Sequence, residues 1–164
     1  MQALGARRLE DLAILGVAAR AELLAIDFYD RAAPAPGFTG AQGRYLRDVG
    51  DHERAHYATL AAALGDDVPV GLRFAYPDGT FDSPASAART GAALEATFLG
   101  AYLGAVAELV DPGLRAVAAR IAAAEAQHLS ALDALLDPVP APAPSLASVL
   151  TVREAADALA PFLA

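Results

Sequence analysis

The chain contains no cysteine, and this absence excludes several kinds of site at once. Disulfides, zinc fingers, thiol nucleophiles and iron–sulfur clusters depend on cysteine, so the chain cannot supply any of them by itself. Basic residues are also scarce, because 12 Lys and Arg stand against 20 Asp and Glu, for a net charge of -8. A phosphate-binding surface needs clustered Lys or Arg, so we expect no nucleic acid partner.

Long apolar runs without charge are missing as well. Glu10 and Asp11 follow closely on the arginines near the N-terminus, so no signal-peptide run develops. We therefore expect a cytoplasmic protein, unless a leader was trimmed. The most apolar long stretch, residues 92–110, contains Glu95 and Glu108, which is typical of a core helix rather than of a membrane span. No membrane association is expected.

What remains in the composition favours packed helices. Of the 164 residues, 55% are hydrophobic, which suits one domain with a substantial core. Start and stop signals divide the chain into four long helices and one short helix. The first runs from about Arg8 to Ala33 and the second from Thr39 to Gly65. The cap pairs Ser83–Pro84 and Asp111–Pro112 begin the third and fourth, and Thr151 with Glu154 caps the short one.

The connections between the helices predict the topology. Residues 66–82 form the longest connection, and their two prolines and Pro-Asp-Gly turn suit a crossover along a bundle. The fold class is therefore all-α, a four-helix bundle with one long crossover between the second and third helices. We expect residues 1–137 to form this bundle, and residues 138–164, a Pro-rich linker and short helix, to pack on the same domain. Gly100 and Gly104 form a G-x-x-x-G pair that predicts close helix packing.

Each long helix carries a glutamate on the apolar stripe that should face the core. In two of the helices a histidine follows that glutamate by three positions, so both side chains lie on one helix face. The glutamates lie at similar depths from their helix starts, so antiparallel packing brings them to one level of the bundle. The stripe residues concerned are Glu22, Glu53, His56, Glu95, Glu125 and His128.

Such a cluster requires neutralising charge, because buried carboxylates close together repel one another and are costly to desolvate. No Lys or Arg lies on these stripes. Two divalent ions would balance four carboxylates, and oxygen donors with two imidazoles suit iron or manganese. A single Glu-x-x-His is often only a solvated pair on a helix surface. Its occurrence in two helices favours the metal site.

Two tyrosines repeat with the same spacing. Tyr29 and Tyr102 each follow a stripe glutamate by seven residues, which indicates an internal duplication of a helix pair. A buried tyrosine is also commonly an ordinary core residue whose hydroxyl is satisfied. His52 immediately precedes Glu53 and lies off the stripe, so we interpret it as an ordinary surface or rim histidine.

Together these motifs resemble those of the ferritin-like superfamily of di-iron carboxylate bundles, over residues 8–136. The sequence from the Pro-Asp-Gly turn onward is similar to a bacterial branch described as ferritin-like domain proteins. The resemblance implies two iron ions as cofactors, with manganese or mixed metals as alternatives. The implied metal ligands are Glu22, Glu53, His56, Glu95, Glu125 and His128. Glu53 and Glu125 would bridge the two ions, and Tyr29 and Tyr102 would be catalytic residues beside them.

One feature of the family is missing. In bacterioferritin-like members an aspartate precedes each Glu-x-x-His and orients the histidine of the other half, but here those positions are His52 and Ala124. Different neighbours must hold His56 and His128 in place, or the affinity for metal will suffer.

The resemblance also implies an activity. We expect a di-iron protein that oxidises Fe(II) or reduces O2 or peroxide, of ferroxidase or peroxidase type, in iron handling or oxidative stress. Its partners would be Fe(II) with O2 or peroxide, and its assembly a homo-oligomer, with a dimer as the expected form. The alternative is a non-catalytic stress-related or interaction bundle in which the metal is only structural. The acidic, Ala-rich surface of the chain and its Pro-linked fifth helix motivate that alternative.

Overall fold

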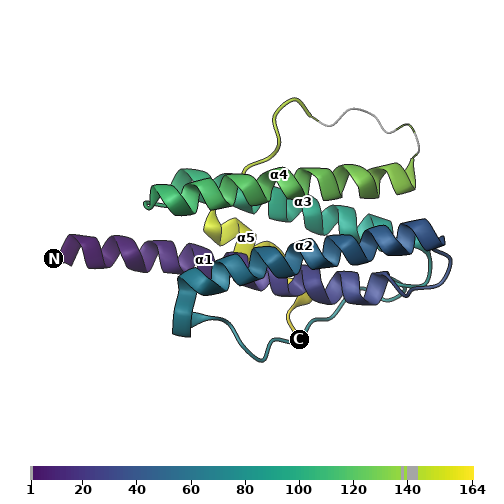
Figure 1. The fold of residues 1–164 in the computed structure, drawn as a ribbon, viewed down its shortest axis with the longest axis horizontal. Coiled ribbons are helices and arrows are strands. Elements are labelled where there is room, and N and C mark those ends of the chain that lie inside the picture. The colour runs from purple at the N-terminus through teal and green to yellow at the C-terminus, as the bar shows by residue number, and fades with distance from the viewer. Residues whose placement is uncertain (1, 138, 140–143) are drawn as a thin grey trace.

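The fold is a bundle of four long helices with a short fifth helix packed on one side (Figure 1). The computed structural model describes residues 2–137, 139 and 144–164, with side chains from residue 9 onward. The helices are α1 (Gln2–Ala32), α2 (Gly40–Leu64), α3 (Pro84–Glu108), α4 (Pro112–Leu136) and α5 (Val152–Leu159). Short 3-10 turns follow α2 and α5, at Gly65–Asp67 and Ala160–Phe162. The all-α class and the crossover between α2 and α3 are confirmed.

The caps that were expected from the sequence begin the helices as predicted. Thr39 and Gln42 form a capping box at α2, and α2 ends where Gly65 takes a φ of 62°. Ser83 caps α3, which begins with proline, and Asp111 accepts hydrogen bonds from two backbone N–H groups of α4. Each cap satisfies N–H groups that the helix itself leaves unpaired, which fixes the starting point of the helix.

Two helix details differ from the prediction. The α1 helix begins at Gln2 rather than near Arg8, because no proline or other stop signal separates these residues from the rest of the helix. Near the end of α2, the heptad stripe that contains Glu53 and His56 continues to Ala63 and predicts it in the core, but Ala63 is exposed and Leu64 is buried. A straight helix repeats every 3.6 residues, so a heptad pattern drifts off the buried face over several turns.

The core consists of two apolar clusters, one toward each end of the bundle. One cluster contains Phe28, Val49 and Phe98, and the other contains Leu15, Leu60 and Ile121. The stripe glutamates lie between these clusters along all four long helices. The apolar layers therefore separate a polar level at mid-bundle from both ends of the protein.

The fifth helix is attached through Gly100 and Gly104 of α3. The backbone N–H of Leu150 donates a hydrogen bond of 3.0 Å to the carbonyl oxygen of Gly100. A Cβ atom on Gly104 would overlap the carbonyl oxygen of Leu150. The predicted close packing is therefore present, but its partner is the extended segment before α5 and not another helix. The absence of side chains at these positions lets that backbone lie directly on α3.

Within the described residues, one helix meets the length and composition of a membrane span. This helix is α3, and 44% of its most apolar 18-residue window is buried inside the bundle. The core helix of a globular bundle can pass the same test.

A side chain at position 104 should displace the segment around Leu150 from α3. We expect Gly104→Ala to lower the Tm by several degrees, because overpacking against a backbone costs about 1–3 kcal/mol. Gly16→Ala is the matched control, since a Cβ there meets nothing within 4 Å and alanine favours a helix by about 1 kcal/mol. Thermal unfolding followed by circular dichroism measures both variants. A Tm for Gly104→Ala equal to or above that of the wild type would contradict this contact.

Candidate metal centre

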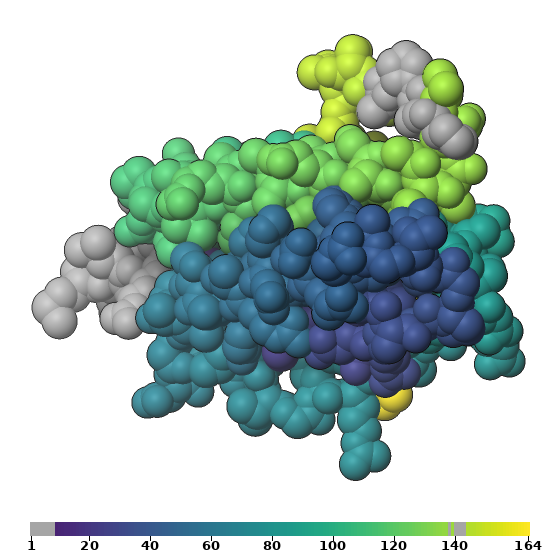
Figure 2. Space-filling model, turned by 45° about the vertical axis from the view of Figure 1, so that its right-hand side comes forward, coloured from purple at the N-terminus to yellow at the C-terminus, as the bar shows by residue number. Residues whose placement is uncertain are grey.

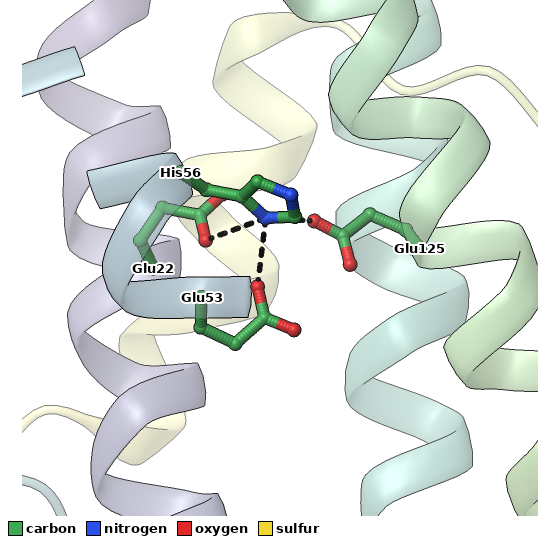
Figure 3. A group of neighbouring side chains, drawn as sticks. All are labelled: Glu22, Glu53, His56 and Glu125. Atoms are coloured by element: carbon green, nitrogen blue, oxygen red, sulfur yellow. Dashed lines mark hydrogen bonds and ion pairs between the residues drawn. The ribbon is translucent and has the colours of Figure 1, made fainter. Parts of the chain in front are cut away.

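The six stripe residues meet at the middle of the bundle. Glu22 comes from α1, Glu95 from α3, and the two Glu-x-x-His pairs come from α2 and α4. All four glutamates are buried, with exposed fractions of 2% or less. Figure 3 shows three of these carboxylates pointing at one imidazole from three different helices. The heptad spacing that made each helix amphipathic also aims these side chains at a common point.

The first group surrounds the imidazole of His56. Its Nδ1 atom lies 2.9 Å from Glu53 Oε2, 3.4 Å from Glu125 Oε1 and 3.5 Å from Glu22 Oε2 (Figure 3). Ligand atoms from these four residues all lie within 4.8 Å of one another. One nitrogen and three carboxylate oxygens at such spacing can hold one metal ion.

The second group surrounds His128 in the same manner. Its Nδ1 atom lies 2.9 Å from Glu53 Oε1, 3.0 Å from Glu125 Oε2 and 3.7 Å from Glu95 Oε1. These four residues also offer ligand atoms within 4.8 Å of one another. Glu53 and Glu125 belong to both groups and present a different oxygen to each. Two adjacent groups, each of which could hold a metal ion, therefore share two carboxylates.

The two tyrosines connect the halves of the centre. The hydroxyl of Tyr29 on α1 donates a hydrogen bond to Glu95 on α3, and the hydroxyl of Tyr102 on α3 donates one to Glu22 on α1. Burial and the adjacent carboxylates raise the pKa of both phenols well above its usual value. Each tyrosine therefore remains a proton donor and holds a glutamate of the other helix pair. These two glutamates, Glu22 and Glu95, are the unshared ones, because each belongs to only one of the two groups.

The chemistry of the donor set fits metal ions. Each of the four glutamates has one buried oxygen without a hydrogen-bond partner among the described residues. For Glu53 this oxygen is Oε1, whose 2.9 Å approach to His128 is an ion-pair contact without hydrogen-bond alignment. Unsatisfied buried oxygens are costly and are seldom left in a core without a ligand. Four carboxylates with such oxygens, beside two imidazoles, suit iron, manganese or a similar divalent ion.

Without metal, protons must supply the positive charge. Burial raises the pKa of Glu22 and Glu95 well above the usual value, and repulsion from Glu53 and Glu125 adds to this effect. Their ion-pair contacts with the histidines lower the pKa of both carboxyls but do not outweigh burial. The unshared glutamates therefore tend to hold a proton in the metal-free protein.

The pKa values of the two histidines are also raised, but for a different reason. Burial alone would lower the pKa of His56 and His128, but contacts with three carboxylates each outweigh it and raise both values to about 12. Burial would likewise raise the pKa of Glu53, but its close contacts with both histidines lower it to about 2. The metal-free centre is thus a set of protonated imidazoles around a shared carboxylate, and divalent ions must displace these protons to bind.

His52 is the residue that the sequence interpretation missed. It is exposed, as expected for a rim histidine, but its Nδ1 atom lies 3.2 Å from Nε2 of His128. The two rings are stacked, with centroids 5.5 Å apart and planes 24° apart. The signal was present in the sequence, because His52 occupies the position from which related bundles use an aspartate to orient the opposite histidine.

These pKa shifts predict how pH affects the metal-free protein. Glu22 and Glu95 bind protons more tightly in the folded chain, so its stability should fall as pH rises above their usual value of 4.5. The two histidines should add to this loss of stability above pH 6.5, their usual pKa. Each group changes the free energy of unfolding by at most about 1.4 kcal/mol per pH unit. In chelator, we expect Tm to decline between about pH 5 and about pH 9.

The control for this decline is Glu22→Gln, which removes one of the responsible groups and keeps its volume. Its Tm should fall less steeply over the same pH range, as measured by circular dichroism. A wild-type Tm that rises with pH in chelator would contradict the assignment of the protons.

Comparison with known proteins agrees with this geometry. The family model described as a ferritin-like domain matches residues 10–138, which include the four long helices from Glu10 onward and all six residues of the centre. No curated protein matches the chain. Because the match covers most of the chain, this protein belongs to the ferritin-like domain family.

Proposed function

We propose that the centre holds two iron ions and uses them to oxidise Fe(II) or to reduce O2 or peroxide. The observation that carries this proposal is the sharing of Glu53 and Glu125 between two four-residue groups. A protein that needed one structural ion would require only one such group. Two adjacent positions with common carboxylates suit chemistry in which two electrons are transferred together.

The protein's own residues would perform three tasks. The six ligands would bind the ions, with the shared carboxylates screening the repulsion between two cations. Tyr29 and Tyr102 would orient the unshared glutamates and, being protonated and buried, lie where they can donate a hydrogen bond or an electron. The apolar clusters on both sides would keep bulk water away from the centre. When bound, iron would supply the change of oxidation state that these side chains cannot.

The alternative is a bundle in which the metal only stabilises the fold. The buried, unsatisfied carboxylate oxygens favour it to some extent, because metal binding would relieve their repulsion whether or not catalysis follows. Both functions require metal binding, so the discriminating measurement must be the rate of a reaction.

Stopped-flow absorbance after addition of Fe(II) in air tests the proposal. We expect iron oxidation faster than in buffer alone, and we expect the Glu53→Gln, Glu125→Gln double variant to return the rate to that of buffer. Peroxide in place of air identifies the preferred oxidant. Tight binding of two ions with no oxidation above the buffer rate, by either oxidant, would favour the structural alternative.

Metal stoichiometry separates shared from unshared ligands. Replacing Glu53 or Glu125 by Gln removes a charge that both ions need, so we expect occupancy to fall at both positions. Replacing His56 or His128 by Ala removes a donor from one ion only, so one metal per chain should remain. Mass spectrometry of the metal content measures each variant. Two metals per chain in both Gln variants would show that these carboxylates are not bridges.

A further inference from the structure

The internal repeat allows the two metal positions to be compared residue by residue. The Glu-x-x-His motif of α2 recurs 72 positions later in α4, and Leu60 recurs at the same interval as Leu132. The buried core positions Val49 and Ile121 are related in the same way. Residues around one histidine therefore have definite counterparts around the other, and any difference between them is a property of this chain.

At His128, another side chain contacts the side of the ring that faces away from the carboxylates. His52 on α2 stacks on the ring and meets its outer nitrogen, Nε2, at 3.2 Å. Tyr45, also on α2 and seven positions before His52, is half-buried and packs against the apolar cluster that contains Leu132 of α4. The His128 side chain is only 3% exposed. Figure 2 shows α4 lying along α2 on the face where these helices meet.

Around His56, the counterparts are small. The residue equivalent to His52 is Ala124, and the residue equivalent to Tyr45 is Val117. Neither side chain can donate or accept a hydrogen bond to the outer nitrogen of His56. A pocket of about 240 Å³ lies here, and Ala55, His56, Thr59, Val117, Arg120 and Ile121 line it. The His56 side chain is 15% exposed, five times the value at His128.

We propose that the two metal positions are unequal. The position at His128 is shielded from solvent, and His52 raises its affinity for metal. The position at His56 opens to the pocket and exchanges its ion with solvent. This inference rests on the proposed binding of two ions. His52 is then a positioning residue, which acts on the metal through His128. The pocket is the route by which metal ions reach the centre.

The hydrogen-bond chemistry gives the physical reason. A neutral imidazole that binds metal through Nδ1 must carry its proton on Nε2. For His128 this N–H can donate to Nδ1 of His52, which fixes the ring with its Nδ1 toward the carboxylates. Loss of such an outer partner typically lowers metal affinity by about 10–100-fold. Among the described residues the ring of His56 has no counterpart of this contact, so its ion should bind more weakly.

Calorimetric titration with Mn(II) tests the inference, because Mn(II) binding needs no oxidant and no turnover. We expect the wild type to bind two ions in distinguishable steps. His52→Ala should weaken the tighter step by about 10–100-fold and leave the weaker step unchanged. His52→Asp, which restores an acceptor for the N–H of His128, should recover most of the lost affinity. Recovery by aspartate excludes a merely structural role for the residue at this position.

The reciprocal variant adds the missing partner to the weaker position. Ala124→Asp should tighten the weaker step, while Ala123→Asp, which adds the same charge on the exposed side of α4, should alter neither step appreciably. Val117→Tyr copies Tyr45 into the pocket. In rapid mixing of Mn(II)-loaded protein with a chelator, the wild type should release one ion quickly and one slowly. The Val117→Tyr variant should lose the fast phase.

The outcomes separate this inference from the proposed function. Equal affinities and one release rate for two wild-type ions, or unchanged affinities in His52→Ala, would overturn the inequality and leave a dinuclear centre in place. Failure of the wild type to bind any Mn(II) or Fe(II) would overturn both. Because His52 is exposed, its variants should keep the wild-type helical circular dichroism, which confirms that folding is intact.

Discussion

The rest of the structure depends on the burial of four carboxylates at one level of the bundle. No Lys or Arg is among the buried residues of the described chain, and the basic groups that lie among these carboxylates are two histidines. The repulsion must be offset by protons or by cations, and the raised pKa values of Glu22 and Glu95 show that protons do so in the absence of metal. A core assembled around this cluster is therefore poised to exchange protons for divalent ions.

The packing around the cluster follows from this constraint. Apolar clusters lie toward both ends of the bundle, so the carboxylates are kept from bulk water and their charges interact through protein. The tyrosines belong to the same arrangement, because each one ties an unshared glutamate to the opposite helix pair. The α5 segment covers α1 and α3 from outside, where the small residues of α3 permit its backbone to approach. Rigidity at the centre thus comes from contacts that cross between the two helix pairs.

Much of this arrangement could be predicted from the sequence, and the reasons are local. Thr39, Ser83 and Asp111 fix helix starts through hydrogen bonds within one turn, and the heptad spacing determines which face of each helix is buried. The convergence of Glu22, Glu53, Glu95 and Glu125 follows from their similar distances along the helices from the connections that join α1 to α2 and α3 to α4. Contacts between segments far apart in the sequence have no such periodic signal. The pairing of Gly104 with Leu150, and of His52 with His128, depends on the three-dimensional packing of different helices.

Duplication of a helix pair produces equal halves only where both copies keep the same residues. In this chain the copies agree at the six residues of the centre and at the adjacent tyrosines, which are the donors that both proposed metal positions would require. They differ immediately outside, where His52 and Tyr45 in one copy correspond to Ala124 and Val117 in the other. Since an outer hydrogen bond affects affinity and an open pocket affects exchange, these few differences are sufficient to assign distinct roles to two chemically similar positions. A symmetric ligand set in an asymmetric surrounding can hold one ion firmly while its neighbour is loaded and released.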